Sequence, residues 1–383
     1  MNESRPVPPW PGAARRLVTF LPLTRKVTKR KPPAHVIPAN AGSQCNRLLG
    51  PGFPRIAVRG RRRGDEQRLA YCATFSGPRS AVQKGHQPHI SLVLVFTLVI
   101  FSASAETLEP GDHSRVINMS GEQRSYVLHM PPLKHKRPLP LVLMLHGAGG
   151  NAAHIEAMTG MSEKADEAGF AIAYPNGSTA FSDLARTWNA GRCCGPAAVA
   201  QVDDVAFLKA VLKDAKSVAT IGRVFVAGFS NGGMMAYRLT CELGGEVAAV
   251  AVIAATFESA CKLKTPTPLL AIHGVQDGLV PFDGFAQTNA FPVQATRSVS
   301  ESVTLFARAN GCEAKPAISE DALLRDSRYA SCDAAVRLIA VKRGAHAWPG
   351  GKKIYPWEAE PTHEISATDV IWKFFSGETS PKN

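Results

Sequence analysis

The sequence predicts an α/β protein whose mostly parallel sheet is covered by helices on both faces. Six short runs are apolar without alternation, which is typical of strands buried on both sides of a parallel sheet. Helical segments separate the runs, and in 202–218 the apolar residues recur on one side of a helix. The six apolar runs are 139–145, 170–174, 223–227, 248–254, 268–272 and 336–341.

The net charge of +13 comes almost entirely from the first part of the chain. Residues 1–85 hold 17 of the 44 basic and 3 of the 31 acidic side chains, which leaves 27 basic and 28 acidic ones for 86–383. A basic protein can indicate a nucleic-acid or membrane partner. Here the charge lies on a segment with Pro-Pro pairs and no sustained period, so we interpret residues 1–81 as a disordered or spurious N-terminal extension. We expect no nucleic-acid partner.

Residues 82–105 have the three parts of a secretory signal peptide. A lysine precedes the apolar run 90–101, and an A-x-A cleavage site follows at 103–105. The run is too short to span a bilayer core of about 30 Å, so we expect no stable membrane anchor. These features predict a secreted protein, extracellular or periplasmic, with a single catalytic domain over 106–383.

The third apolar run ends in a G-x-S-x-G sequence, residues 228–232, and a helical segment follows it. This arrangement is typical of a nucleophile elbow, in which a strained turn between a strand and a helix exposes the serine hydroxyl. The glycines are needed because side chains on either side of the turn would collide with the strand or the helix. The context predicts Ser230 as a catalytic nucleophile.

A nucleophilic serine needs a base and an orienting carboxylate. In the α/β-hydrolase fold these follow the serine in the order Asp, then His, each after a strand. Run 268–272 leads to Asp277 and run 336–341 leads to His346, so we predict these as the acid and the base. Asp283 is the nearest rival for the acid. His363 also lies downstream, but it opens the terminal helical segment, where we expect a structural role.

Other ionisable residues near strand ends are expected to be structural. Asp203 and Asp204 precede the serine and open a helix, where an acidic side chain favours the helix dipole. His146 and His273 lie at strand ends and are expected to brace loops. The second half of the oxyanion hole should come from the glycine-rich loop after 139–145, so we predict the N–H groups of Ala148, with Gly149 as the neighbouring alternative, and of Asn231.

Six cysteines follow residue 105, and their use agrees with export. Cys312 and Cys332 flank a polar, strand-like excursion and are the first pair we expect to form a disulfide. The partners of the adjacent Cys193 and Cys194 are left open. No cysteine has the spacing of a zinc site, and we expect neither a metal nor a cofactor.

Several motifs together resemble the polyhydroxybutyrate depolymerase/feruloyl esterase family, secreted α/β-hydrolases that are also grouped with carbohydrate esterases. The resemblance covers about residues 115–375 and implies the same roles for Ser230, Asp277 and His346. It also implies that Trp188 and Trp348 line the substrate cleft. The chain departs from the family in having alanines on both sides of His346. The motifs are HGAGGN, TWNAGRCCG, VDDVAFL, GFSNGGMMAYRLTC, HGVQDGLVPF and GAHAWPG.

These observations predict a secreted serine carboxylester hydrolase of the polyhydroxybutyrate depolymerase type, acting through an acyl-enzyme on an ester such as a hydroxyalkanoate oligomer. The alternative is a feruloyl or acetyl xylan esterase acting on polysaccharide-linked esters. More distant alternatives are a serine peptidase and a catalytically silent binding protein. Only about a dozen residues separate the runs 248–254 and 268–272, so we expect no large lid domain there.

Overall fold

The computed structural model describes residues 108–119, 121–132, 138–179, 186–260, 262–284 and 297–377. All of them belong to one compact unit, Val99–Asn383. The expected extension 1–81 and the signal peptide 82–105 lie outside the described residues.

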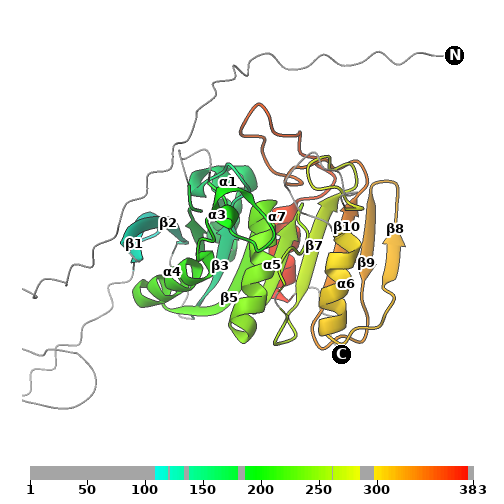
Figure 1. Cartoon of the computed structure of the whole chain (residues 1–383), viewed down its shortest axis with the longest axis horizontal. Coiled ribbons are helices and arrows are strands. Elements are labelled where there is room, and N and C mark those ends of the chain that lie inside the picture. Colours follow the sequence, from blue (N-terminus) through cyan, green and yellow to red (C-terminus); the bar gives the residue numbers. More distant parts are fainter. Residues whose placement is uncertain are drawn as a thin grey trace, which may run out of the picture. The chain divides into compact units, whose positions relative to one another are not determined.

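The described residues form a ten-stranded sheet in the order β1-β2-β4-β3-β5-β6-β7-β10-β9-β8 (Figure 1). The six strands from β4 to β10 in this order are parallel to their neighbours, as the sequence predicted. Their bounds are β3 (Leu139–Leu145), β4 (Ala171–Pro175), β5 (Ile221–Phe229), β6 (Ala249–Ile253), β7 (Leu269–Gly274) and β10 (Val336–Val341).

Helices cover both faces of this sheet (Figure 1). Because side chains alternate along a strand, Leu141 and Leu143 of β3 pack under α4, α5 and α6, whereas Val142 and Met144 pack under α1, α2 and α7. This is the expected α/β-hydrolase layering. The helices are α1 (Ala152–Thr159), α2 (Met161–Ala168), α3 (Gly195–Val199), α4 (Asp204–Val218), α5 (Asn231–Leu243), α6 (Val299–Ala309) and α7 (Ala367–Ser376), with a 3₁₀ turn at Gly244–Glu246.

Antiparallel strands border the parallel strands on both edges of the sheet. The hairpin of β1 (Gly111–Met119) and β2 (Glu122–Met130) pairs with β4, and β8 (Ala317–Glu320) with β9 (Leu324–Arg328) extends β10. The second pair corresponds to the strand-like excursion expected between Cys312 and Cys332. The first hairpin was not expected, because β1 is polar and only half-buried along its length.

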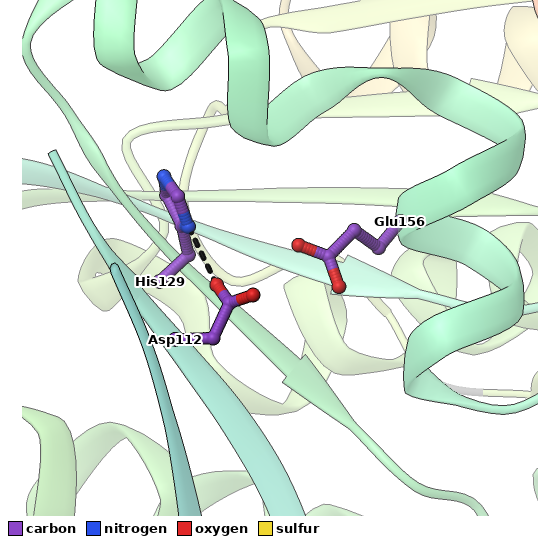
Figure 2. Close-up of side chains that lie close together, drawn as sticks. All are labelled: Asp112, His129 and Glu156. Atoms are coloured by element: carbon purple, nitrogen blue, oxygen red, sulfur yellow. Dashed lines mark hydrogen bonds and ion pairs between the residues drawn. The ribbon is translucent and has the colours of Figure 1, made fainter.

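The β1–β2 hairpin carries a charged cluster where it meets α1 and α2. The buried imidazole of His129 lies 2.6 Å from Asp112 Oδ1 through Nδ1 and 3.0 Å from Asp166 Oδ1 through Nε2. Figure 2 shows His129 and Asp112 facing Glu156, which extends from α1. Burial alone would lower the pKa of His129, but the two carboxylates raise it overall.

The connection between β6 and β7 is short, running only from Ala254 to Pro268, so the expectation that no large lid is inserted there is confirmed. The β10–α7 connection, between Val341 and Ala367, is longer and contains neither helix nor strand. It is the orange-red loop that leads into α7 (Figure 1). His363 lies in this loop and not at the start of the helix, which is a small correction.

Candidate active site

Ser230 occupies the turn between β5 and α5 with φ 53° and ψ −124°. This left-handed φ is unfavourable for a residue with a side chain, and such strain is typical of functional turns. A Cβ at Gly228 would lie 2.3 Å from Gly232 O, and a Cβ at Gly232 would lie 2.4 Å from His146 O. The glycines of the G-x-S-x-G sequence therefore allow the elbow that the sequence predicted.

The three side chains expected at the catalytic centre are in hydrogen-bond contact. Ser230 Oγ lies 3.0 Å from His346 Nε2, and His346 Nδ1 lies 2.7 Å from Asp277 Oδ2. They follow three of the parallel strands, β5, β7 and β10, whose carboxyl ends meet at one edge of the sheet. The Asp277 side chain is fully buried, whereas the His346 side chain is 11% exposed.

Asp277 is surrounded by hydrogen-bond donors. Its Oδ1 accepts from the N–H groups of Leu279 (2.9 Å) and Val280 (2.7 Å), and His273 Nε2 lies 3.4 Å from Oδ2. Burial would raise the pKa of this carboxyl, but hydrogen bonds from His273, His346 and Val280 hold it well below its usual range. Asp277 is therefore an anion aligned with His346.

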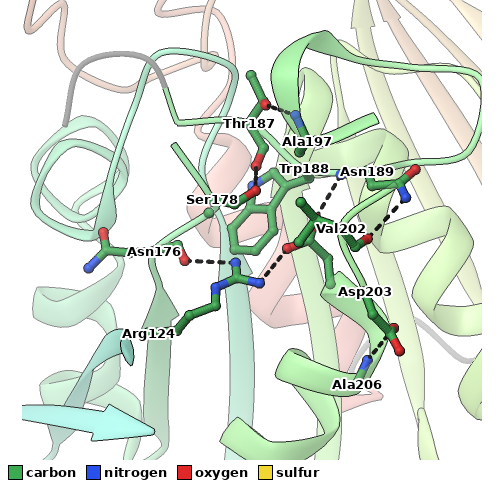
Figure 3. Close-up of polar contacts among 12 residues, drawn as sticks. Arg124, Asn176, Ser178, Thr187, Trp188, Asn189, Ala197, Val202, Asp203 and Ala206 are labelled. Atoms are coloured by element: carbon green, nitrogen blue, oxygen red, sulfur yellow. Dashed lines mark hydrogen bonds and ion pairs between the residues drawn. The ribbon is translucent and has the colours of Figure 1, made fainter. Parts of the chain in front are cut away.

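The other acidic residues considered from the sequence have different surroundings from Asp277. Asp283 is exposed. Asp203 is the N-cap of α4 and accepts from Ala206 N at 2.9 Å, as its expected structural role requires. Asp204 is fully buried and forms an ion pair of 2.7 Å with Arg124, so it does more than complement the helix dipole. Figure 3 shows Arg124 extending from β2 toward the start of α4.

The backbone N–H groups of the two predicted oxyanion donors have no acceptor among the described residues. Ala148 and Asn231 line a cavity of about 510 Å³ together with Ser230. The Gly149 N–H, the alternative donor, is already donated to Arg186 O at 2.8 Å. The geometry therefore favours Ala148 over Gly149.

The two histidines expected to brace loops do so. His146 Nδ1 lies 2.8 Å from Gly147 O, and His146 Nε2 accepts from Gly177 N at 2.9 Å. Complete burial lowers the pKa of His146 to about 3, which keeps the ring neutral. His273 Nε2 lies 2.8 Å from Val280 O and so holds the loop that carries Asp277.

Trp188 is not where the sequence placed it. Its side chain is completely buried and does not line the cavity. The indole Nε1 donates to His146 O at 2.9 Å. The Arg124 guanidinium lies 6.0 Å from the centre of the Trp188 ring (Figure 3). Periodicity does not reveal which way a loop tryptophan faces. The expected cleft-lining role of Trp188 is therefore corrected to a packing role.

Trp348 does line the cavity, although only 1% of it is exposed. Its indole donates to Thr368 Oγ1 at 3.1 Å, and its ring meets the edge of Phe229 at 6.5 Å. A second aromatic contribution, from the β10–α7 loop, was not expected from the sequence. Tyr355 and Trp357 line the same cavity. The feature of the sequence that could have indicated this is the aromatic content of the segment that follows His346.

The structure contains the disulfide expected between Cys312 and Cys332. Cys193 and Cys194, whose partners were left open, are joined to each other and line the cavity. Cys241 is also disulfide-bonded.

One group of side chains has the composition of a metal site. Ligand atoms of Asp112, His129 and Glu156 lie within 4.8 Å of one another (Figure 2). Both nitrogens of His129 already face a carboxylate, and Glu156 accepts from Ser162 Oγ at 2.6 Å. A protonated imidazole between carboxylates accounts for this arrangement without an ion.

None of the helices among the described residues is long and apolar enough to cross a membrane. Residues 124–262 match the family model described as "Esterase PHB depolymerase". "Putative esterase NocK" of Nocardia uniformis subsp. tsuyamanensis is 35% identical over 69% of this chain and 82% of its own length. "Feruloyl esterase C" of Emericella nidulans is 28% identical over 66% of this chain and 83% of its own length.

Among solved structures, an acetyl xylan esterase from Aspergillus awamori is 13% identical, with a TM-score of 0.48 over 69% of this chain and 99% of that one. The identity and coverage of the relative from Nocardia uniformis, together with the match to the family model, assign the chain to a family. This chain belongs to the esterase PHB depolymerase family.

Proposed function

We propose that this chain is a serine carboxylester hydrolase that works through an acyl-enzyme. The observation that carries the proposal is the continuous contact Ser230–His346–Asp277 beside two unpaired backbone donors. A nucleophile, a base and an oriented carboxylate in this arrangement suit acyl transfer. Membership of an esterase family supports an ester as the substrate.

In the proposed reaction, Ser230 Oγ attacks the ester carbonyl carbon while His346 Nε2 takes the hydroxyl proton. The resulting oxyanion accepts hydrogen bonds from the N–H groups of Ala148 and Asn231. Collapse breaks the bond to the alcohol oxygen, which takes the proton from His346 and leaves as the alcohol. Water, deprotonated by the same nitrogen, then attacks the acyl-serine. The second intermediate collapses to the acid and Ser230, whose Oγ takes the proton back from His346. Asp277 keeps the imidazole oriented and stabilises its charged form.

Replacement of the nucleophile tests this directly. Ser230→Ala should abolish turnover of p-nitrophenyl butyrate and labelling by a fluorophosphonate probe, whereas Ser319→Ala, on the exposed strand β8, should retain both. Full labelling and turnover by Ser230→Ala would reject the proposal. Ester turnover without turnover of the matching p-nitroanilide separates an esterase from a peptidase.

The family description favours hydroxyalkanoate oligomers as substrates, and one observation favours aromatic esters instead. His154, Tyr355 and Trp357 form a stack at the cavity, with ring centroids 4.6 and 4.7 Å apart and rings 17° and 16° from parallel. Glu358 holds the stack, since Oε1 lies 2.6 Å from His154 Nε2 and Oε2 accepts from Tyr355 N at 2.9 Å. Trp357 remains 74% exposed, which suits a flat substrate ring.

A substrate panel distinguishes the two classes. We would compare kcat/KM for 3-hydroxybutyrate oligomers, methyl ferulate and acetylated xylan in the wild type and in Trp357→Ala. If aromatic esters are the substrates, methyl ferulate should give the highest kcat/KM, and the variant should lower its kcat/KM relative to the oligomers about tenfold. An oligomer preference that the variant does not alter would favour the polyester class.

We also propose that the chain is exported and cleaved after residue 105. The disulfide between Cys312 and Cys332 supports an oxidising compartment. Intact-mass measurement of the exported protein should give a chain that begins at Glu106. A mass that includes residues 1–81 would overturn this.

A further inference from the structure

We propose that residues 186–189 act as a clamp that sets the geometry of the oxyanion hole, with Trp188 as its positioning residue. This inference rests on the proposed function, because it assigns a role to residues around the donors Ala148 and Asn231. It concerns a segment that does not line the cavity and that the catalytic residues alone would not identify.

The clamp holds the first half of the oxyanion hole through two hydrogen bonds. The loop after β3, which contains Ala148, receives the Trp188 indole N–H on His146 O (2.9 Å) and donates its Gly149 N–H to Arg186 O (2.8 Å). These two bonds lie on either side of Ala148 along the chain. The direction of the Ala148 N–H therefore depends on residues 186–188.

The same segment holds the second half through a reciprocal pair. Trp188 N donates to Asn231 Oδ1 at 2.7 Å, and Asn231 Nδ2 donates to Trp188 O at 3.0 Å. Asn231 is only 1% exposed and lines the cavity, so its amide side chain is a structural link next to the backbone N–H that we assign to the oxyanion hole. One residue, Trp188, thus joins the two loops that supply the oxyanion donors.

Hydrogen bonds to neighbouring segments hold the clamp itself in place (Figure 3). Asn189 N donates to Asp204 Oδ2 at 2.7 Å, Asn189 Nδ2 donates to Val202 O at 3.0 Å, and Thr187 N donates to Ser178 O at 2.9 Å. Asp204 is in turn paired with Arg124. A preorganised donor pair is effective because it does not reorient during the reaction, and these contacts supply that rigidity.

Trp188→Phe tests the clamp, because it keeps a buried aromatic ring and removes the indole N–H. We expect kcat for p-nitrophenyl butyrate to fall about tenfold with KM within twofold of the wild type, since the lost contact acts on the transition state. Affinity for a trifluoromethyl ketone, which forms an oxyanion on Ser230, should fall by the same factor. Affinity for the product butyrate should not change.

Two further variants keep the test decisive. Trp372→Phe is the matched control. Trp372 belongs to α7 and stacks on Phe170, away from the site, so this variant should leave kcat and inhibitor affinity unchanged. Asn231→Ala removes the reciprocal pair but keeps the backbone N–H, so it should lower kcat like Trp188→Phe. The double variant should lower kcat no further than the more affected single variant, because either change releases the same hole.

Equal changes in kcat, KM and butyrate affinity, or additive losses in the double variant, would overturn the clamp. If Trp188→Phe does not fold, Asn231→Ala with unchanged kcat and inhibitor affinity would overturn it alone. Loss of the proposed function is a separate outcome, because Ser230→Ala with wild-type turnover would reject the serine mechanism whatever Trp188 does.

Discussion

Asp277 has more donors around it than the orientation of one imidazole requires. Two backbone N–H groups fix Oδ1, which leaves Oδ2 for His346 and His273. Both oxygens are therefore constrained before substrate binds, and the carboxylate keeps its charge in a buried position because of these contacts. The two oxygens of Asp277 therefore have different partners. Replacing one of them by an amide nitrogen, in Asp277→Asn, tests the role of the carboxylate.

Asp277→Asn should keep the fold and lower kcat roughly 10³–10⁴-fold, because an amide can no longer hold the imidazole in the reactive tautomer with a negative charge. The measurement is kcat for p-nitrophenyl butyrate. Asp283→Asn, on the exposed rival in the same loop, should keep wild-type kcat. Similar losses in the two variants would reject the assignment of Asp277.

The structure brings predicted site residues into contact where the backbone fixes the position of a side chain. Ser230, Asp277 and His346 follow strands, and the ends of parallel strands meet at one edge whatever the details of packing. Trp188 was misplaced because its direction depends on contacts with His146 and Asn231, residues more than 40 positions away. The Tyr355–Trp357 contribution was missed for a similar reason, since no period identifies a loop that folds back over a site.

At the scale of whole elements, the six buried strands were predictable because burial on both faces leaves continuous apolar runs. The antiparallel edge strands are half-exposed or fully exposed, as the burial of β1 and β8 shows. Their sequences carry little hydrophobic pattern, so pairing partners and not composition determine that they form strands. Of these edge strands, only the β8–β9 segment was anticipated, as a polar, strand-like excursion between Cys312 and Cys332.

The disulfide that closes this β8–β9 excursion should contribute stability without affecting the site. Cys312 and Cys332 are 20 residues apart, and for a loop of this length the entropic model gives about 3 kcal/mol. The double variant Cys312→Ser, Cys332→Ser should lower the free energy of unfolding by about that amount in urea titration. kcat should remain that of the wild type. A large loss of kcat in folded protein would contradict this separation.

The buried pair Arg124–Asp204 joins β2 to the start of α4, and its two side chains are 9% and 0% exposed. Asp204→Ala should lower the free energy of unfolding by roughly 3–5 kcal/mol, because it leaves a buried guanidinium without its partner. The pair variant Arg124→Met, Asp204→Leu should recover much of that loss. Asp203→Asn is the matched control, since asparagine is an equally good N-cap, and it should cost less than about 0.5 kcal/mol. Urea unfolding checks all three.

At the scale of the whole molecule, stability should depend on pH at both ends of the range. The Arg115 guanidinium lowers the pKa of Asp214, and hydrogen bonds outweigh burial to lower that of Asp277. A carboxyl whose folded pKa is lowered contributes stability above its unfolded pKa of about 4, and this is lost as the pH falls through the folded pKa. Asp214 and Asp277 therefore both contribute to the loss of stability in acid, whereas a histidine affects stability near neutral pH.

That residue is His129, whose pKa is raised by Asp112 and Asp166 against the effect of burial. A histidine with a raised folded pKa contributes stability that is fully present below its unfolded pKa of about 6.5 and is lost as the pH rises through the folded pKa. The melting temperature of the wild type should therefore fall toward that of His129→Gln as the pH rises above about 6.5. The control is His113→Gln, at a half-buried residue of the same hairpin whose Nε2 lies 2.7 Å from Glu109 O. The difference in melting temperature between the wild type and this variant should not narrow in the same way. A difference in melting temperature between the wild type and His129→Gln that stays constant as the pH rises would reject the protonated imidazole. If EDTA lowers the melting temperature of the wild type but not that of His129→Gln, the cluster holds a metal ion instead.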